Sequence, residues 1–167
     1  LPIKCLCLSS AGLTNTDTYL SRDEYDGVIR PKKDTIVLSK DGSVGIAYKI
    51  EEDTDVITSG AILHLIIKDD SVKPDYLTLV LNSIVVKMQA ERDAGGSVIQ
   101  HWKPSEIEKV VIPILDNEVK VQITEKVQES FALRRESIRL LELAKTADEV
   151  AIEQGEDKAM ELLTQDM

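Results

Sequence analysis

The chain has 167 residues, 43% of them hydrophobic, which is enough for one packed domain with an appendage and excludes disorder along the whole length. Its formal net charge of −10 excludes a surface that is basic everywhere. Nucleic-acid binding becomes less expected but stays open, because a local basic face is sufficient to contact phosphates.

The excess of acid is not evenly distributed. Residues 1–115 contain 13 Lys and Arg against 17 Asp and Glu, whereas residues 116–167 contain 7 against 13. No run reaches the roughly 18 apolar residues of a membrane helix, and no charged-then-apolar secretory leader opens the sequence. We therefore expect a cytoplasmic protein without membrane contact.

The cysteine and histidine content is low. Cys5 and Cys7 are the only cysteines, and His64 and His101 are distant from them in sequence. Two thiols are too few for a zinc site, so we expect small buried side chains on a strand rather than metal ligands or a disulfide. We predict no metal and no cofactor.

The first elements in chain order are β-type. "PIKCLCLSS" (2–10) predicts a strand, "AGLTNTD" (11–17) is typical of a turn and loop, and the polar residues 18–34 predict a connecting loop. Two β-rich runs at 35–39 and 44–50 are joined by Lys40-Asp41-Gly42-Ser43. An Asp-Gly pair between such runs predicts a hairpin.

The next two elements differ in period. Residues 61–67 are apolar without alternation, which predicts a strand buried on both faces. From Pro74 the apolar residues recur at threes and fours, which predicts an amphipathic helix, or two helices broken near Asn82-Ser83, that stops at Gly95-Gly96. Its expected buried stripe consists of Leu77, Val80, Leu81, Ile84, Val85 and Met88.

The end of the first domain combines three short signals. "SVIQHW" (97–102) is compatible with an extended segment, Pro104 opens a single short helix, and "VVIPIL" (110–115) predicts a strand in which Pro113 lies at an edge or at the end. Strands and helices do not alternate regularly. We therefore predict an α+β fold with a mixed sheet and packed helices over residues 1–115.

Residues 116–167 contain no further proline and predict a long coiled-coil-type helix that Gly155 ends or bends. Its apolar residues form two adjacent stripes, a band wide enough to require a partner helix. The first stripe, our candidate helix interface, consists of Ile123, Val127, Phe131, Ile138 and Leu141. The second consists of Leu133, Leu140, Ala144, Ala147 and Ala151.

The order of these pieces resembles a known family. A Gly-x-x-Gly hairpin in "LSKDGSVGIAYKI", a Pro-led helix in "KPDYLTLVLNS", a turn in "AGGSVI", a short helix that leads into Ile-Pro in "KPSEIEKVVIPI" and a long charged helix follow one another between about residues 31 and 152. In this order the sequence is similar to the specificity subunits of type I restriction-modification systems.

The resemblance implies a target recognition domain for one half of a split DNA site, followed by a spacer and dimerisation helix that docks DNA methyltransferase subunits. Complete subunits of the family carry two such domains and two helices, so this chain corresponds to a half-subunit or to a piece of a longer one. Its expected partners are double-stranded DNA, the methyltransferase subunits and a second copy of the chain through the C-terminal helix.

Sequence-specific DNA binding needs donors and acceptors at base edges and cations near phosphates. Residues 40–43, 97–103 and the basic cluster "RPKKD" (30–34) offer such groups, although a plain turn also explains the first, and a solvated loop is the commoner explanation of the third. Trp102 is expected to pack in the core. The candidate DNA-binding residues are Arg30, Lys32, Lys33, Lys40, Ser43, Ser97, Gln100, His101 and Lys103.

The sequence has no Walker-type Gly-Lys-Ser/Thr, no Gly-x-Ser-x-Gly elbow, no His-Glu-x-x-His and no Asn-Pro-Pro-aromatic motif. We therefore predict a non-catalytic specificity subunit, with catalysis in partner methyltransferase and nuclease subunits. The alternative is a protein-protein interaction or oligomerisation module that does not bind DNA, and the acidic charge balance favours it.

Overall fold

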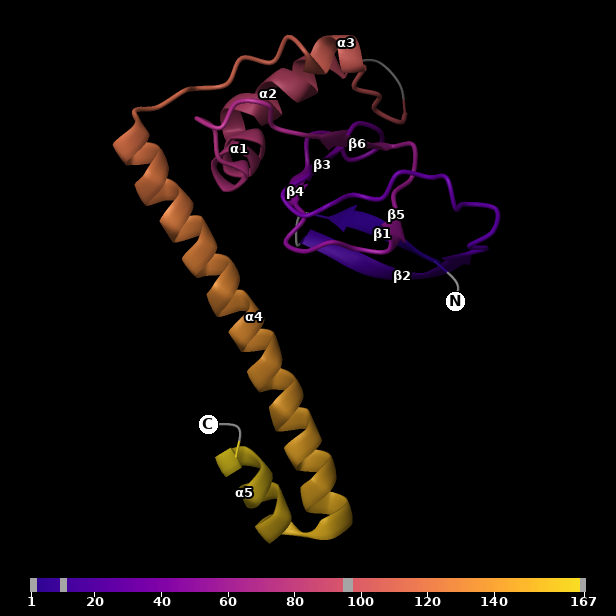
Figure 1. Cartoon of the computed structure of the whole chain (residues 1–167), viewed down its shortest axis with the longest axis vertical. Helices are drawn as coiled ribbons and strands as arrows, with labels where there is room; N and C mark the ends of the chain where they lie inside the picture. The colour runs from indigo at the N-terminus through magenta and orange to yellow at the C-terminus, as the bar shows by residue number, and fades with distance from the viewer. Residues whose placement is uncertain (1–2, 10–11, 95–97, 166–167) are drawn as a thin grey trace. The chain divides into compact units, whose positions relative to one another are not determined.

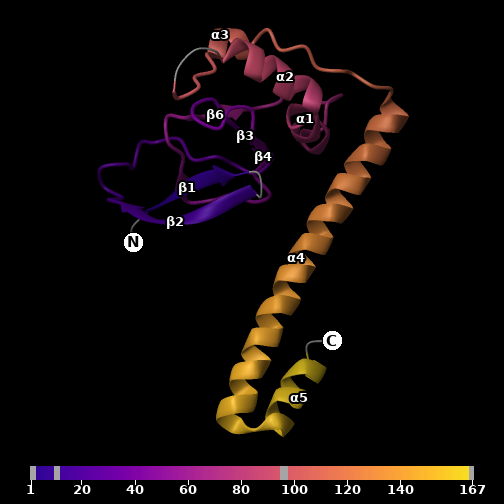
Figure 2. The same ribbon diagram turned by 180° about the vertical axis from the view of Figure 1, so that it is seen from behind.

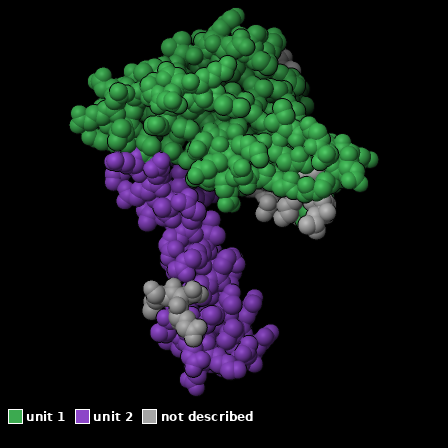
Figure 3. Space-filling view, in the orientation of Figure 1, with its two compact units in different colours: residues 1–124 green, residues 125–167 purple. Residues whose placement is uncertain are grey.

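The computed structural model describes residues 3–9, 12–94 and 98–165, and the chain divides into unit 1 (residues 1–124) and unit 2 (residues 125–167), coloured separately in Figure 3. Unit 1 combines strands with packed helices and the chain continues into a long helix, so the fold is α+β as predicted. The long helix α4 (Asn117–Gln154) contains the division, and its first turns belong to unit 1.

One three-stranded sheet contains β1 (Ile3–Ser9), β2 (Gly12–Leu20) and β5 (Val56–Ile57) in the order β2-β1-β5. β1 and β2 pair antiparallel, whereas β1 and β5 pair parallel. The prediction of loop structure was wrong for residues 12–20, which form β2. Threonines alternate along β2, and β-branched residues favour strands once a neighbouring strand supplies the backbone partners.

The second sheet contains β3 (Ile36–Ser39), β4 (Ala47–Lys49) and β6 (Ile62–Leu65) in the order β4-β3-β6, and both pairings are antiparallel. The predicted hairpin is confirmed, because Ile36 pairs with Lys49 at one end of β3 and Leu38 pairs with Ala47 near the other. β3 is the central strand, and all four of its residues are buried.

The strand predicted at 61–67 is shorter than expected and is not buried on both faces. β6 ends at Leu65, every residue of it is only half-buried, and Ile66 is 76% exposed. β6 is an edge strand whose one strand neighbour is β3. The apolar run predicted a strand that is buried on both faces. Its position at the edge of the sheet leaves β6 partly exposed instead.

Of the two predicted alternatives, the structure has two consecutive helices, α1 (Pro74–Leu81) and α2 (Ile84–Asp93), with the break at Asn82-Ser83, and both lie beside the β4-β3-β6 sheet in Figures 1 and 2. The Asn82 amide explains the break. Its Oδ1 accepts from Ala47 N at 3.0 Å and its Nδ2 donates to Ala47 O at 2.8 Å, so the side chain pairs with edge strand β4 as a strand would.

The break also corrects the predicted buried stripe. Val80 and Leu81 of α1 are buried, but Ile84, Val85 and Met88 of α2 are 67%, 50% and 62% exposed. α2 instead buries Val86 and Ala90. The prediction assumed one helical phase through residues 74–94, and the break at Asn82-Ser83 resets that phase, so a different face of α2 points inward.

Trp102 lies in the core of unit 1 and is 1% exposed, which confirms its predicted packing role. Its neighbours in this cluster come from the β4-β3-β6 sheet and from α1 and α2, and include Ile36, Leu38, Tyr76 and Val86. Burial of a large aromatic side chain among residues from four elements makes it a principal contact of the core.

The short helix α3 (Pro104–Ile107) is confirmed, but no strand forms at 110–115. The Gln89 side chain accepts from Val111 N and donates to Val111 O, both at 2.9 Å, and the Tyr76 hydroxyl donates to Pro113 O at 2.8 Å. Gln89 of α2 and Tyr76 of α1 therefore form hydrogen bonds with backbone groups that would otherwise pair with a neighbouring strand.

Gly155, at φ +97°, separates α4 from α5 (Glu156–Gln165), as the sequence predicts for a helix end. Figures 1 and 2 show α5 turned back along the C-terminal end of α4. Ala147 of α4 and Ala159 of α5 are each 6% exposed, so the C-terminal part of the second stripe finds its partner helix within the chain. Among the described residues, no helix has the length and apolar character needed to span a membrane.

Candidate nucleic-acid interface

Two of the predicted DNA-binding segments, residues 40–43 and 100–103, lie together and are called the loop pair below. Asp41 and His101 form an isolated antiparallel β-bridge. Gly42 N donates to the carbonyl of Gln100 at 2.9 Å, and Trp102 N donates to the carbonyl of Lys40 at 2.7 Å. Backbone hydrogen bonds therefore join segments that are 60 residues apart in sequence.

The first loop is shaped by local contacts at the end of β3. The Ser39 hydroxyl donates to Ser43 O and accepts from Ile46 N, so one side chain bridges both ends of the turn. Gly42 and Gly45 have φ of +75° and +80°, a backbone conformation that favours glycine. A Cβ on Gly45 would also lie 3.3 Å from the Cβ of Ala90, so this turn packs closely on α2.

The second loop is held by the core on one side. Trp102 is buried there, while the adjacent side chain of His101 is 61% exposed. On the other side, Lys103 begins α3, where Lys103 N donates to Glu106 Oε2 at 3.0 Å. The backbone of residues 101–103 is therefore held by Trp102 in the core and by the start of α3. The exposed side chains of His101 and Lys103 project from this held segment.

The charged side chains of the loop pair converge on Asp41. Its Oδ2 lies 2.6 Å from Lys40 Nζ, and its Oδ1 lies 2.8 Å from His101 Nδ1. The hydrogen bond from Lys40, and then that from His101, hold the pKa of Asp41 below its usual value, so its carboxylate is ionised at neutral pH. Asp41 therefore sets the positions of both neighbours.

The remaining predicted residues of the two loops differ in exposure. Ser43 is exposed, Gln100 is half-buried, and the Lys103 side chain is 72% exposed with its Nζ 3.5 Å from Glu106 Oε1. Ser97 lies outside the described residues. Lys40, Ser43, Gln100, His101 and Lys103 are consequently brought into one region of unit 1.

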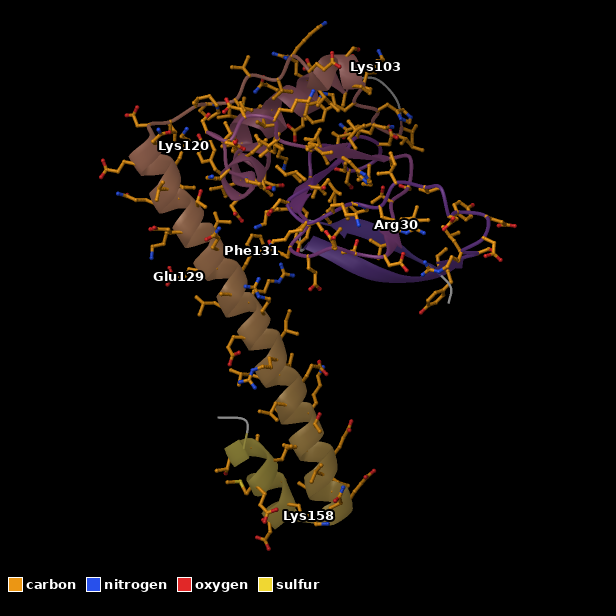
Figure 4. All side chains as sticks on the ribbon, in the orientation of Figure 1. Arg30, Lys103, Lys120, Glu129, Phe131 and Lys158 are labelled. Atoms are coloured by element: carbon orange, nitrogen blue, oxygen red, sulfur yellow. The ribbon has the colours of Figure 1, made fainter. Side chains whose placement is uncertain are left out.

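The basic cluster Arg30, Lys32 and Lys33 is not part of the loop pair. It precedes β3, whereas the first loop follows β3, and a four-residue strand spans about 13 Å. Figure 4 shows the same separation, with Arg30 beside the strands of unit 1 and Lys103 at the start of α3. The two sets of cations therefore do not form one continuous site.

Two of these cations already have carboxylate partners. Arg30 Nε lies 2.8 Å from Asp55 Oδ1, and Arg22 contacts the other oxygen of Asp55. Lys32 Nζ lies 3.6 Å from Asp53 Oδ2, and Asp53 Oδ1 also accepts from the backbone N of Lys33. These contacts within the chain account for Arg30 and Lys32 without a nucleic acid, although only Lys32, at 70% exposure, is solvated, and the Arg30 side chain is 17% exposed.

A hollow of about 530 Å³ lies beside this cluster, between residues 29–35, the end of β6 and residues 70–74. Its walls include aliphatic side chains and His64. The Nε2 of His64 lies 2.8 Å from the Thr58 hydroxyl, and burial lowers the pKa of His64, so it is a hydrogen-bonded histidine on an edge strand. The lining carries Asp34 and Asp70 together with four basic residues, Arg30, Lys32, Lys33 and Lys73, of which Arg30 and Lys32 are already paired with Asp55 and Asp53.

The predicted helix interface does not behave as one face. Ile123 packs against the core of unit 1, whereas Ile138 and Leu141 are 54% and 57% exposed. Val127 and Phe131 are half-buried; Phe131 is labelled on α4 in Figure 4. The exposed apolar surface of α4 is completed by residues of the second stripe, Leu133 and Leu140.

Sequence reasoning quoted Asp41 only as part of a turn and missed its position between the two loops. No local signal in the sequence links it to His101, because the contact joins segments 60 residues apart. The described residues contain no group of three or more His, Cys, Asp and Glu side chains that can hold a metal ion.

No protein-family model matches the chain, and no curated protein sequence is similar to it at a significant level.

Proposed function

We propose that unit 1 recognises a specific sequence in double-stranded DNA as one half-site reader of a type I restriction-modification complex. The proposal rests on the order of sequence elements that resembles the specificity subunits of that family. One structural observation supports it most: the loop pair unites two segments that were selected from the sequence as candidate DNA contacts for independent reasons.

The chemistry of the loop pair suits a DNA groove. Gln100 carries an amide, the group that pairs bidentately with adenine, and Lys103 is a cation for guanine or phosphate. Gly42 has nothing within 4 Å of the position a Cβ would occupy, so the backbone there is open to approach by a phosphate. The loops are also braced by backbone hydrogen bonds, which limits the entropy lost on binding.

The helical part has a different proposed role. α4 is a continuous helix of 38 residues, and such a helix is about 57 Å long at 1.5 Å per residue. We propose that it spaces the half-site reader from a second one and docks methyltransferase subunits through exposed apolar residues such as Leu133, Ile138 and Leu141. Catalysis would belong to those partner subunits and to a nuclease subunit.

Selection from a random duplex library, followed by gel-shift titration, tests the proposal. The full chain is used with and without the methyltransferase subunits that its host encodes. We expect enrichment of one sequence and an affinity that falls steeply with salt, because phosphate contacts release counterions. Recovery of no enriched sequence in either arm would contradict DNA recognition.

A protein-protein interaction module without DNA binding is the second candidate. The exposed apolar residues of α4 and the net charge of −10 favour it. In that case the same titrations would give no duplex complex at any salt concentration, while sedimentation would detect self-association that is lost in Leu133→Ser/Leu141→Ser.

A further inference from the structure

The loop pair contains one carboxylate, Asp41, among three side chains that carry or accept positive charge: Lys40, His101 and Lys103. A carboxylate repels phosphate oxygens. A surface that bound DNA through phosphates alone would therefore gain no affinity from a carboxylate. The Asp41 side chain is 25% exposed, so DNA bound at the loop pair would meet it.

The contacts of Asp41 restrain the two cations beside it. Lys40 Nζ at 2.6 Å and His101 Nδ1 at 2.8 Å each use one carboxylate oxygen. An ionised carboxylate has about four lone-pair sites, so Asp41 retains acceptor capacity beyond these two contacts. Within a major groove, that capacity suits the exocyclic amino group of a cytosine.

We propose that Asp41 is a specificity-determining residue of the loop pair, which suppresses binding through phosphates alone and holds Lys40 and His101 for contacts with base edges. This inference rests on the proposed DNA recognition. Repulsion from the carboxylate weakens binding to every sequence, whereas base-edge hydrogen bonds compensate for it only at the target. The ratio of specific to non-specific affinity is thereby enlarged.

The test compares Asp41→Asn and Asp41→Glu with the parent in the full chain, on the duplex that the parent enriches and on a random-sequence duplex. Asp41→Asn should bind the random duplex about two- to fivefold more tightly, the effect of one exposed charge pair. Its salt slope should steepen by about 0.9 for each additional phosphate that the variant neutralises. Asp41→Glu keeps the charge and should bind the random duplex as weakly as the parent.

A carboxylate with a purely structural role gives a different result, since its removal would weaken binding to both duplexes. That outcome in Asp41→Asn would overturn the inference, as would an unchanged affinity ratio or an increase of random-duplex affinity in Asp41→Glu equal to that in Asp41→Asn. Glu91→Gln, which makes the same change in net charge at an exposed α2 residue, is the matched control. An equal increase in this control would also overturn the inference, because net charge alone would explain it.

If the parent shows no preference among duplexes, the proposed DNA recognition fails before Asp41 is tested. The failure of the two proposals is therefore distinguishable in one set of titrations.

Discussion

The residue chosen at a position in unit 1 can depend on the local backbone conformation, on long-range contacts, or on both. Gly42 and Gly45 allow these two effects to be distinguished. Both have positive φ, but only Gly45 lies close to a neighbour, the Cβ of Ala90. The Gly-x-x-Gly spacing predicts a turn from sequence alone. The close approach of the second glycine to α2 is a tertiary feature that the spacing does not reveal.

Gly45→Ala should lower the free energy of unfolding by about 2 to 4 kcal/mol, because backbone strain and crowding against Ala90 add. Gly42→Ala should lower it by about 1 to 2 kcal/mol, since only backbone strain applies where space is open. Urea unfolding of both variants measures the difference. Equal losses would show that the contact with α2 contributes nothing.

Gln100 is the residue whose amide we place against a base pair. Gln100→Ala should cost about 1 to 3 kcal/mol of discrimination at one position of the target and leave the other positions unchanged. Selection with the variant and with the parent on the same library measures this. A uniform loss at all positions would instead indicate that Gln100 supports the loop pair without contacting a base.

Lys49 forms the most buried ion pair of the described residues, with its Nζ 2.6 Å from Asp75 Oδ1 and 3.3 Å from Glu51 Oε1. Burial opposes the charge on Lys49, but the two carboxylates outweigh it, and the pKa of Lys49 is raised. Lys49→Met should therefore destabilise the protein by about 3 to 5 kcal/mol near neutral pH, because the buried Asp75 carboxyl would lose its cationic partner.

The sign of the pH dependence follows from the raised pKa. The contribution of Lys49 is fully present below its unfolded pKa of about 10.4 and is lost as pH rises through the folded pKa. The stability difference between the parent and Lys49→Met should thus shrink only in strongly alkaline solution. Lys87→Met, which removes an exposed partner of Glu91, is the control and should show little effect at any pH.

At the scale of elements, two amide side chains replace strand partners. Asn82 binds both backbone groups of Ala47, and Gln89 binds both backbone groups of Val111. The first protects an edge strand, and the second holds residues 110–115 against α2. These contacts explain why an apolar run that contains Pro113 remains extended without joining a sheet.

Gln89→Ala should accelerate amide hydrogen exchange at Val111 and lower stability by about 1 kcal/mol, the net contribution of an exposed hydrogen-bonded amide. Gln89→Glu keeps an acceptor for Val111 N and should retain most of the protection. Exchange measured by NMR distinguishes the variants. Unchanged exchange in Gln89→Ala would mean that the segment is held by other contacts.

At the scale of the whole molecule, the start of α4 is tied to unit 1. The buried side chain of Lys120 donates to Ser71 O at 3.0 Å, and Ile123 packs against the core. With the Tyr76 contact to Pro113, these interactions attach residues 113–123 to the rest of unit 1. A spacer element must be attached in this way if it is to set a distance.

Several Gly and Ser residues inserted between Leu115 and Asn117 should relax the half-site spacing that the assembled complex accepts, because the joint would then be flexible. Selection on libraries with variable spacers measures the accepted spacing. The same insertion between Gln154 and Glu156, at the turn before α5, should leave it unchanged. Unchanged spacing in the first variant would contradict the role of α4 as a spacer.

Features that depend on neighbouring residues could be predicted without the structure. The hairpin at 35–50, the break at Asn82-Ser83, the short helix at Pro104 and the long helix that ends at Gly155 were all predictable, because turn chemistry, proline and helical period act within a few residues. The same information selected residues 40–43 and 100–103 as separate candidates. It did not indicate that they are joined.

Which segments meet and which faces are buried depends on long-range packing and could not be predicted from local patterns. The strand partner of residues 12–20, the inward face of α2, the extended path of 110–115 and the link from Asp41 to His101 each depend on groups distant in the chain. A local pattern states which conformation a segment favours. The partners that satisfy the backbone hydrogen bonds of a segment and cover its apolar side chains depend on the packing of the whole unit. The candidate interface could therefore be recognised only in the folded structure.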